Sequence, residues 1–368
     1  MSSQPTSLDH GFRPRVQRLV APLVAPPVFD FWAAKVDRSW SWERPLARII
    51  DRRQESADAV TLTLRANGHW RGFNAGQHIN VTAEIDGVRV TRSYSPSSAP
   101  GSRRMLQITV KAIEGGRLSR HLCRTARVGD VLELGQAFGA MTLPPSPPGP
   151  LLFLAAGSGI TPLMSLVRQL AGQGMPAPLT LFYSARTRSE LCFLEELRAL
   201  AAAHPGFVVH FVLTREAAGA ADEREGRIDA GMLREFGSDL AQRHVFACGP
   251  GGFVASAQAL VATEAASFLA EAFTPPPSTI EEGGQVQVTL ARSGRTLDVP
   301  RGQSLLSALE AQGLRPASGC RMGICNTCSC AKRSGQTRHL HTGELTAEPV
   351  TALKLCISGA TTDLVLDL

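Results

Sequence analysis

Hydrophobic positions follow two different periods along the chain, and the change of period separates two kinds of domain. From Ala47 to Leu134, short segments alternate apolar and polar residues, and Asp86-Gly87 between two of them predicts a hairpin turn. The alternating segments are 59–64, 78–85, 107–111 and 131–134. Several short strands at this spacing predict an antiparallel β-barrel.

The second kind of domain begins after the proline-rich segment 144–150, which predicts a stiff boundary. Beyond it the apolar residues form continuous runs, with helical patterns between the runs. The runs are 151–156, 179–184, 208–213 and 244–247. Strands that are apolar on both faces and alternate with helices predict an α/β domain with a doubly wound parallel sheet.

A third, smaller domain follows the proline run 274–278, which predicts a semi-rigid linker. Here we expect two strands, a helix over 304–311 and a small α+β unit that a cofactor helps to stabilise. The predicted strands are 285–290 and 296–299. The predicted division is an N-terminal arm (1–45), a barrel (46–146), a doubly wound domain (147–274), a linker (275–284) and an α+β domain (285–368).

The N-terminal arm mixes proline, apolar and aromatic residues between Val20 and Trp42 without a clean period. We expect it to pack as an ordered segment on the domain that follows. A short amphipathic membrane contact is the alternative.

Composition narrows the class of protein. Apolar residues make up 43% and charged residues 19% of the chain, which is typical of a folded domain protein and excludes a disordered one. The apolar runs fall far short of the roughly 20 residues that a membrane-spanning helix needs, and no secretory pattern opens the chain, so we expect a cytoplasmic protein. The net charge of +6 is spread along the sequence without a basic run that alternates with aromatic residues, which argues against nucleic-acid binding.

Cysteines gather in the C-terminal domain. Cys320, Cys325 and Cys328 are separated by four and two residues, and Cys356 follows later in the chain. This spacing, C-x4-C-x2-C…C, is the one that plant-type 2Fe–2S clusters use, and soft thiolates suit iron. A zinc site is the alternative, although zinc usually pairs two C-x2-C units or adds histidines. We therefore predict four metal ligands, with Cys330 as a bystander.

The sequence Arg92-Ser-Tyr-Ser95, at the end of one of the predicted barrel strands, indicates a flavin site. A flavin needs an aromatic face, a cation for its pyrophosphate and a polar group near its reactive nitrogen, and these side chains supply all three. Downstream, Gly115-Gly-Arg-Leu-Ser119 predicts a helix start whose free amides bind phosphate. The predicted flavin-binding residues are Arg92, Tyr94, Ser95, Lys111, Gly116, Leu118 and Ser119.

A glycine-rich turn lies between the run 151–156 and a predicted helix that begins at about Pro162, and it indicates a site for a nicotinamide dinucleotide. Gly157 and Gly159 let the backbone approach a pyrophosphate, and Thr161 and Gly249 are placed in the same site.

Arginines follow two further strands of this domain. One or two of Arg186, Arg188 and Arg215 would clamp the 2′-phosphate of NADP, and solvated loop arginines are the alternative. These residues favour NADPH over NADH. Cys248 ends a later strand, where its simplest role is that of a small buried residue.

With these motifs in place, residues 46–273 resemble the ferredoxin–NADP reductase superfamily, and residues 285–368 resemble a plant-type ferredoxin of β-grasp fold. The resemblance implies that the flavin is FAD and that Arg92 and the amides of 116–119 hold its pyrophosphate. It also implies that Ser95, Cys248 and Glu271 surround the hydride path and act as the catalytic residues, while Phe273 covers the flavin face. Unlike free plant ferredoxins, this C-terminal domain carries more basic than acidic residues.

The order of domains resembles reductases that serve fatty-acid desaturases or hydroxylases. It implies an NAD(P)H:acceptor oxidoreductase that passes electrons from NADPH through FAD and a 2Fe–2S cluster to a membrane di-iron enzyme, with peripheral membrane contact through that acceptor. A soluble Rieske-type or other oxygenase is the alternative acceptor. A redox-sensing binding protein is the alternative from another class.

Overall fold

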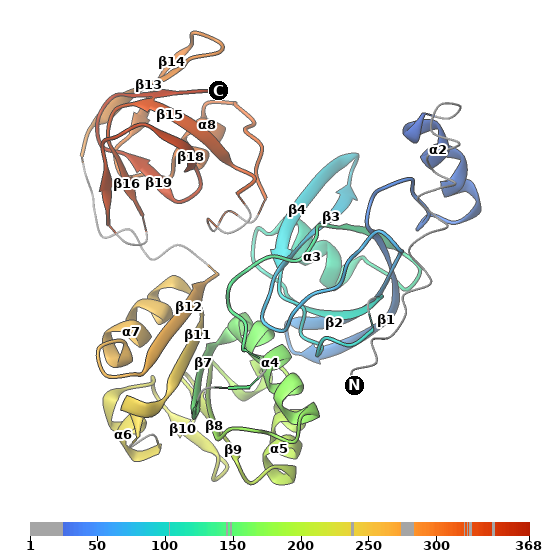
Figure 1. The fold of residues 1–368 in the computed structure, drawn as a ribbon, viewed down its shortest axis with the longest axis vertical. Coiled ribbons are helices and arrows are strands. Elements are labelled where there is room, and N and C mark those ends of the chain that lie inside the picture. Colours follow the sequence, from blue (N-terminus) through green and yellow to red (C-terminus); the bar gives the residue numbers. More distant parts are fainter. Residues whose placement is uncertain are drawn as a thin grey trace, which may run out of the picture.

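The computed structural model describes residues 25–102, 104–144, 146–147, 149–236, 239–273, 283–319, 321, 323, 326–340 and 343–368. Figure 1 shows three bodies in chain order: a barrel with a short helix at its outer end, a layered α/β domain, and a small C-terminal domain. This is the predicted fold class, which is confirmed. The predicted linker 275–284 lies almost wholly outside the described residues and stays a prediction.

The arm contributes helix α2 (Pro26–Val36), which starts with two prolines, residues whose fixed φ suits a first helical turn. Residues 37–45 then pack on the barrel, where the Asn67 amide donates to the Ser39 and Arg44 carbonyls at 3.1 and 2.9 Å. The expectation of an arm packed on the next domain is therefore confirmed for this stretch. Residues 1–24 lie outside the described chain.

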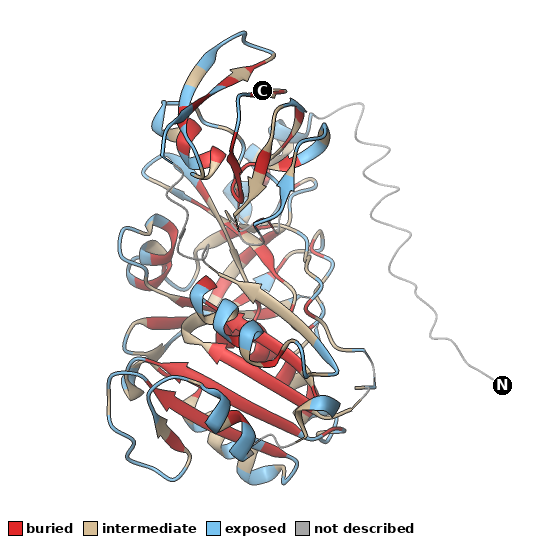
Figure 2. Ribbon diagram, turned by 90° about the vertical axis from the view of Figure 1, so that its left-hand side faces the viewer, coloured by how far each residue is buried: buried red, intermediate tan, exposed pale blue. Residues whose placement is uncertain are grey.

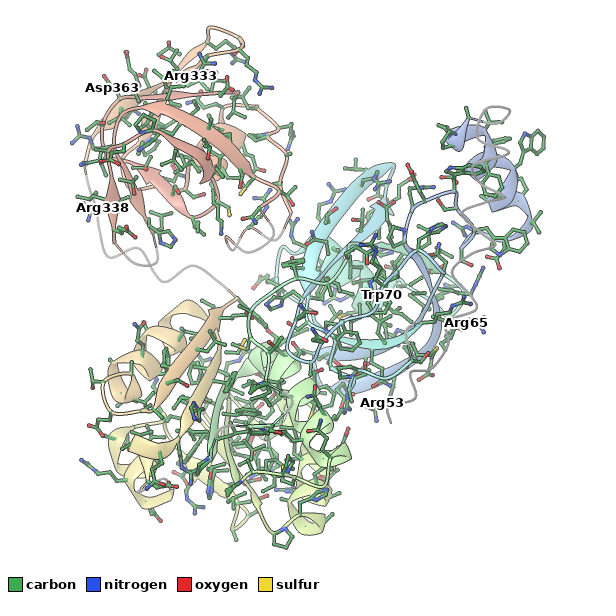
Figure 3. All side chains as sticks on the ribbon, viewed as in Figure 1. Arg53, Arg65, Trp70, Arg333, Arg338 and Asp363 are labelled. Carbon is green, nitrogen blue, oxygen red and sulfur yellow. The ribbon has the colours of Figure 1, made fainter. Side chains whose placement is uncertain are left out.

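The barrel is a six-stranded antiparallel sheet in the order β4-β3-β6-β1-β2-β5. Alternate residues are buried in β3 and β6, and Trp70 lies inside while Arg53 and Arg65 project from the outer surface (Figure 3). Asp86 and Gly87 both have positive φ, as the predicted hairpin between β3 and β4 requires. The elements are β1 (Leu46–Ser56), β2 (Ala59–Ala66), β3 (Ile79–Ile85), β4 (Val88–Tyr94), β5 (Met105–Lys111), α3 (Arg117–Arg124) and β6 (Val131–Leu134).

The second domain is a six-stranded parallel sheet in the order β10-β9-β8-β7-β11-β12. Leu151, Phe153 and Ala155 pack into one core, and Leu152 and Leu154 pack into another. Burial on both faces explains why the sequence shows continuous apolar runs, and Figure 2 shows the central strands of the sheet buried, whereas β12 at one edge is mostly half-buried. The strands are β7 (Leu151–Ala156), β8 (Leu179–Ala185), β9 (Phe207–Leu213), β10 (Glu223–Glu225), β11 (His244–Gly249) and β12 (Ser267–Ala272).

Helices cover both faces of this sheet (Figure 1). They are α4 (Ile160–Gly172), α5 (Leu194–Ala203), α6 (Ala230–Phe236) and α7 (Gly251–Val261), with single 3₁₀ turns η1 (Gly157–Gly159), η2 (Arg188–Glu190) and η3 (Leu240–Gln242). Strand order reverses between β7 and β11, and such a reversal places a ligand crevice outside the carboxyl ends of the strands.

The barrel and the parallel-sheet domain pack directly on each other. Ala59, Ala75 and Met141 of the first domain belong to the core of the second. Across the contact, Ser165 Oγ donates to the Ser98 carbonyl at 2.6 Å. The two domains therefore hold their facing surfaces in a fixed relation.

The C-terminal domain has a five-stranded sheet in the order β14-β13-β20-β15-β18 and a small sheet β17-β16-β19. Helix α8 (Leu305–Ala311) begins at Ser304, whose hydroxyl accepts from the Ser307 amide. One core unites the strands and the helix. The strands are β13 (Gln285–Leu290), β14 (Thr296–Pro300), β15 (Ser329–Ser334), β16 (Thr337–His339), β17 (Leu345–Thr346), β18 (Val350–Lys354), β19 (Ser358–Ala360) and β20 (Leu364–Leu366).

Candidate functional site

Two adjoining cavities lie between the domains. The first, of about 410 Å³, lies at the end of β4 and the start of α3 and also receives residues from the other two domains. The second, of about 600 Å³, lies at the carboxyl ends of the parallel strands. Lys111 and Ser158 line both, so a ligand in one cavity lies beside a ligand in the other.

Arg92 supplies an unneutralised cation to the first cavity. Within the described chain its guanidinium makes no ion pair and donates only to the Thr91 carbonyl, at 2.7 Å. Burial lowers the pKa of Arg92, and the nearby Arg321 lowers it further. A half-buried cation without a counter-ion is suited to an anionic ligand, so this feature fits the pyrophosphate of FAD.

Helix α3 adds backbone amides to the same wall. Gly116 precedes it, no acidic residue occupies its first turn, and Ser119 within that turn is buried. A side chain at Gly116 would place its Cβ 2.5 Å from Ser119 Oγ and 3.0 Å from the Ile113 carbonyl oxygen, so this close packing favours glycine. The positive end of the helix thus meets the cavity that Arg92 lines, as a phosphate site needs.

Tyr94 and Leu118 give this cavity its apolar wall. Leu118 is buried, and burial raises the pKa of the Tyr94 phenol, which therefore stays neutral. An aromatic ring beside a buried aliphatic side chain suits a flat heteroaromatic ligand.

A series of buried polar contacts, which the sequence did not predict, is centred on His78 in the wall of the cavity. Its Nδ1 lies 2.7 Å from Ser95 Oγ, and its Nε2 contacts Glu271 Oε2. His78 and Ser95 are 1% and 2% exposed, so water does not compete for these contacts. His78 thereby connects the two predicted catalytic residues Ser95 and Glu271, which come from different domains.

Phe273 lines this end of the cavity, and Cys248 lies buried behind it, outside the lining of either cavity. Cys248 pairs with Glu271 across β11 and β12, and burial, with a further contribution from Glu271, raises the pKa of its thiol, which stays protonated. The Phe273 amide donates to the Gly249 carbonyl at 2.8 Å. The ring centroids of Phe273 and His78 are 6.2 Å apart. Gly249 therefore acts on the site through its backbone, by holding Phe273.

The glycine turn after β7 forms the floor of the second cavity. Gly157 has φ 55°, and a Cβ on Gly159 would overlap the Cys248 carbonyl, so η1 lies directly against β11. Thr161 Oγ1 donates to the Ser158 carbonyl at 3.0 Å and fixes the turn from inside the helix. Gly157 and Ser158 of this turn line the cavity, and a tight turn before a helix is suited to a dinucleotide pyrophosphate.

The predicted arginines divide into two groups. Arg186 lines the second cavity, together with Arg227, which the sequence prediction missed. Arg188 points elsewhere: it binds Glu223 at 2.6 Å and also contacts Glu216, so its charge is neutralised. Arg215 is exposed and outside the cavity lining, so the expectation of a phosphate clamp is not supported for Arg188 or Arg215.

Lys111 and Arg186, two basic residues that line the second cavity, both form ion pairs with acidic residues. Lys111 binds Asp58 and Glu190 at 3.0 and 2.9 Å, and these bonds raise its pKa despite burial. Arg186 binds Glu190 at 2.8 Å. Arg227, by contrast, makes no ion pair within the described chain, which leaves its guanidinium available to a ligand.

Half of the predicted iron site can be described. Cys328 and Cys356 are buried with their sulfurs 3.2 Å apart, and the Gly323 amide donates to Cys356 Sγ at 3.2 Å. Two buried thiols at this distance, with an amide directed at one of them, suit one iron ion of a cluster. Cys320 and Cys325 lie outside the described residues.

The cluster loop also contributes to the flavin cavity through Arg321. Its guanidinium is held by Glu310 with two bonds of 2.8 and 2.5 Å, and it lines the cavity with Arg92. The C-terminal domain therefore stands with its cluster loop against the flavin site.

Comparison with known proteins agrees with this arrangement of sites. Three family models match in order: an oxidoreductase FAD-binding domain over 46–142, an oxidoreductase NAD-binding domain over 153–259 and a 2Fe-2S iron-sulfur cluster binding domain over 288–360. The chain is thus an oxidoreductase that uses FAD, NAD(P)H and a 2Fe–2S cluster.

Relatives extend the match to the whole chain. An NADPH oxidoreductase of Mycobacterium tuberculosis is 34% identical over 98% of this chain and 92% of its own length. The glycine betaine monooxygenase reductase subunit of Pseudomonas aeruginosa is 28% identical over 90% of this chain and 97% of its own. Phthalate dioxygenase reductase shares the fold, with a TM-score of 0.60 and 23% identity over 88% of this chain and 97% of that one. The chain belongs to the ferredoxin–NADP reductase family, as a hybrid with a C-terminal 2Fe–2S domain.

Proposed function

We propose that this protein is the reductase component of an oxygenase system, in which electrons from NADPH reach a separate oxygenase by way of FAD and the 2Fe–2S cluster. The observation that carries the proposal is the contiguity of the three sites: Lys111 and Ser158 join the two cavities, and Arg321 joins the flavin cavity to the cluster loop. Bound FAD supplies the chemistry that accepts a hydride and releases electrons singly.

The chain's own residues then have positional roles. Arg92 and the amides of 116–119 hold the FAD pyrophosphate, Tyr94 and Leu118 contact the flavin, and Phe273 covers its face. Ser95, Cys248 and Glu271 surround the hydride path, with the Cys248 thiol remaining protonated. Gly157, Gly159 and Thr161 form the pyrophosphate turn for NADPH, and Arg186 and Arg227 face the 2′-phosphate. Cys320, Cys325, Cys328 and Cys356 hold the iron.

The names of relatives support an oxygenase as acceptor, because they include reductase subunits of a glycine betaine monooxygenase and a stachydrine N-demethylase, at 28% and 29% identity. One feature favours a second candidate, a membrane-bound di-iron desaturase or hydroxylase. Helix α2 exposes Phe31 and Trp32 to solvent, as an enzyme that works at a membrane surface would.

The test is electron delivery by the purified protein. NADPH is expected to bleach the flavin bands and to reduce cytochrome c rapidly. The Cys356→Ser variant is expected to keep flavin bleaching but to lose the 2Fe–2S signal and most cytochrome c reduction. Cys330→Ser is the matched control, because Cys330 is also buried but lies outside the ligand spacing. Full cytochrome c reduction by Cys356→Ser would refute the proposed route.

The acceptor is tested by turnover with either partner. We expect NADPH-driven product formation when the reductase is mixed with an oxygenase component. Turnover with a membrane-bound desaturase and none with any oxygenase would transfer the assignment to the second candidate.

A further inference from the structure

Helix α2 is oriented with its acidic side chains toward the protein. Asp30 accepts from the Trp42 amide at 2.6 Å and binds Arg44 Nε at 3.1 Å, while Asp37 binds Arg48 at 2.6 Å. Ala33, on the same side of the helix, is its buried residue. Polar anchors thus fix the side of α2 that faces the barrel.

The opposite side of α2 carries large apolar residues into solvent. Val28, Trp32 and Val36 recur at intervals of four residues, which places them on one face, and Phe31 adjoins them. We call these four residues the α2 stripe; they are 51%, 66%, 76% and 57% exposed in that order. Among the described side chains, every exposed Phe or Trp lies in this stripe or at nearby Trp40. Ordinary surface helices show the reverse pattern, so the stripe marks a contact surface.

The charges around the stripe are positive. Lys35 and Arg38 are exposed, and Lys35 Nζ lies 5.3 Å from the Phe31 ring centre. Because Asp30 is bonded to residues 41–44 and Asp37 to Arg48 of β1, the outward side of the helix combines aromatic rings with cations.

We propose that the α2 stripe docks on the surface of an anionic lipid bilayer. Tryptophan and phenylalanine enter the boundary between headgroups and acyl chains, and lysine and arginine bind the anionic headgroups. The helix lies on the surface and does not cross it, because its 11 residues span about 16 Å, half the hydrocarbon thickness. No described helix is long and apolar enough to cross a membrane.

The geometry and charge both favour this occupant. Figure 1 shows α2 at the end of the barrel far from the other two domains, so a flat surface can reach the stripe without covering either cavity. Two copies of the stripe placed face to face would bring their Lys35 and Arg38 side chains together, which disfavours a second copy of this chain as occupant. A surface of anionic headgroups neutralises the same charges.

The experiment measures co-sedimentation of the full-length holoprotein with vesicles. We expect it to bind vesicles of phosphatidylcholine mixed with phosphatidylglycerol and not vesicles of phosphatidylcholine alone. The double variant Phe31→Ser/Trp32→Ser is expected to bind at least roughly tenfold more weakly, and Lys35→Glu/Arg38→Glu to lose binding as well. Val208→Ser, an exposed apolar position on β9, is the matched control and is expected to bind like the parent.

Each outcome bears on the proposal. Equal sedimentation of the parent and Phe31→Ser/Trp32→Ser overturns it, as does a parent dimer in vesicle-free solution that this double variant abolishes. NADPH-driven cytochrome c reduction without vesicles is expected to be the same in the parent and the double variant, because the stripe lies outside both cavities. Loss of membrane binding with unchanged reduction therefore leaves the proposed reductase function intact.

Discussion

Arg227 offers a direct test of how the second cavity selects its nucleotide. It lines the cavity, it is exposed, and it makes no ion pair within the described chain. Arg186 lines the same cavity but is bound to Glu190 at 2.8 Å. A 2′-phosphate therefore meets one free guanidinium and one that is already shared, and we expect Arg227→Ala to weaken NADPH use more than Arg186→Ala does.

The size of the effect follows from the exposure of Arg227. A hydrogen bond to a charged group contributes about 1.5–3 kcal/mol, and solvent screening of an exposed side chain places Arg227 at the low end, about 1.5–2 kcal/mol. That range corresponds to a loss of about 10- to 30-fold in kcat/KM for NADPH. For Arg186→Ala we expect about a threefold loss, because Glu190 competes with the phosphate for the same guanidinium.

The assay compares kcat/KM for NADPH and NADH in each variant. NADH lacks the 2′-phosphate, so Arg227→Ala is expected to change its kcat/KM less than about twofold. Arg215→Ala is the matched control, since Arg215 is exposed after β9 but lies outside the cavity lining. An equal loss with both nucleotides, or no loss with NADPH, would show that Arg227 does not contact the 2′-phosphate.

Two further predictions concern buried polar groups. His78→Asn breaks the contacts that join Ser95 to Glu271 and is expected to slow flavin bleaching by NADPH about 10- to 100-fold in stopped flow, with FAD retained. His69→Gln, outside the cavity, is expected to leave the rate unchanged. Bleaching at the parent rate in His78→Asn would refute the role of His78. Arg188 lowers the pKa of Glu223 from 4.5 to about 2, so its ionised form stabilises the fold above pH 4.5 and this contribution is lost as pH falls toward 2. Glu223→Gln is expected to lower the free energy of unfolding, measured with urea, by about 2 kcal/mol at neutral pH and by less in acid. Glu195→Gln, at an exposed position, is expected to leave it unchanged. A loss that does not depend on pH would contradict this assignment.

Local pattern was sufficient for most of the fold. The apolar run 151–156 coincides with β7, and the alternating segment 285–290 coincides with β13, because the burial of each strand determines which of its positions are apolar. The strands β12, β15 and β18, of five or six residues, were not predicted, nor were strands of two or three residues such as β10 and β17, in which so short a segment shows no period. Their position depends on the neighbours with which they pair.

The candidate site likewise contains residues that the local sequence pattern predicts and residues that it does not. Cysteine spacing and glycine turns are local, so candidate roles for Cys328 and Gly157 could be predicted from the sequence. His78 joins the site because Ile79 pairs with Tyr94 and because β12 brings Glu271 to it, and neither contact has a signature near His78. Arg188 resembles Arg186 in sequence but is neutralised by Glu223, a residue 35 positions away, and only the folded chain distinguishes the two.

Arg321 indicates how one cluster loop can take part in two exchanges. It belongs to the ferredoxin domain but lines the flavin cavity, so the loop face around it is covered by the flavin domain in this arrangement. The same face is then closed to a separate protein, and an acceptor must use another face of the loop or wait until the domain moves away. Arg321 also contributes to lowering the pKa of Arg92, which means that the two cations repel each other until an anion lies between them. On the proposed placement of the FAD pyrophosphate beside Arg92, flavin binding and the seating of the ferredoxin domain favour each other.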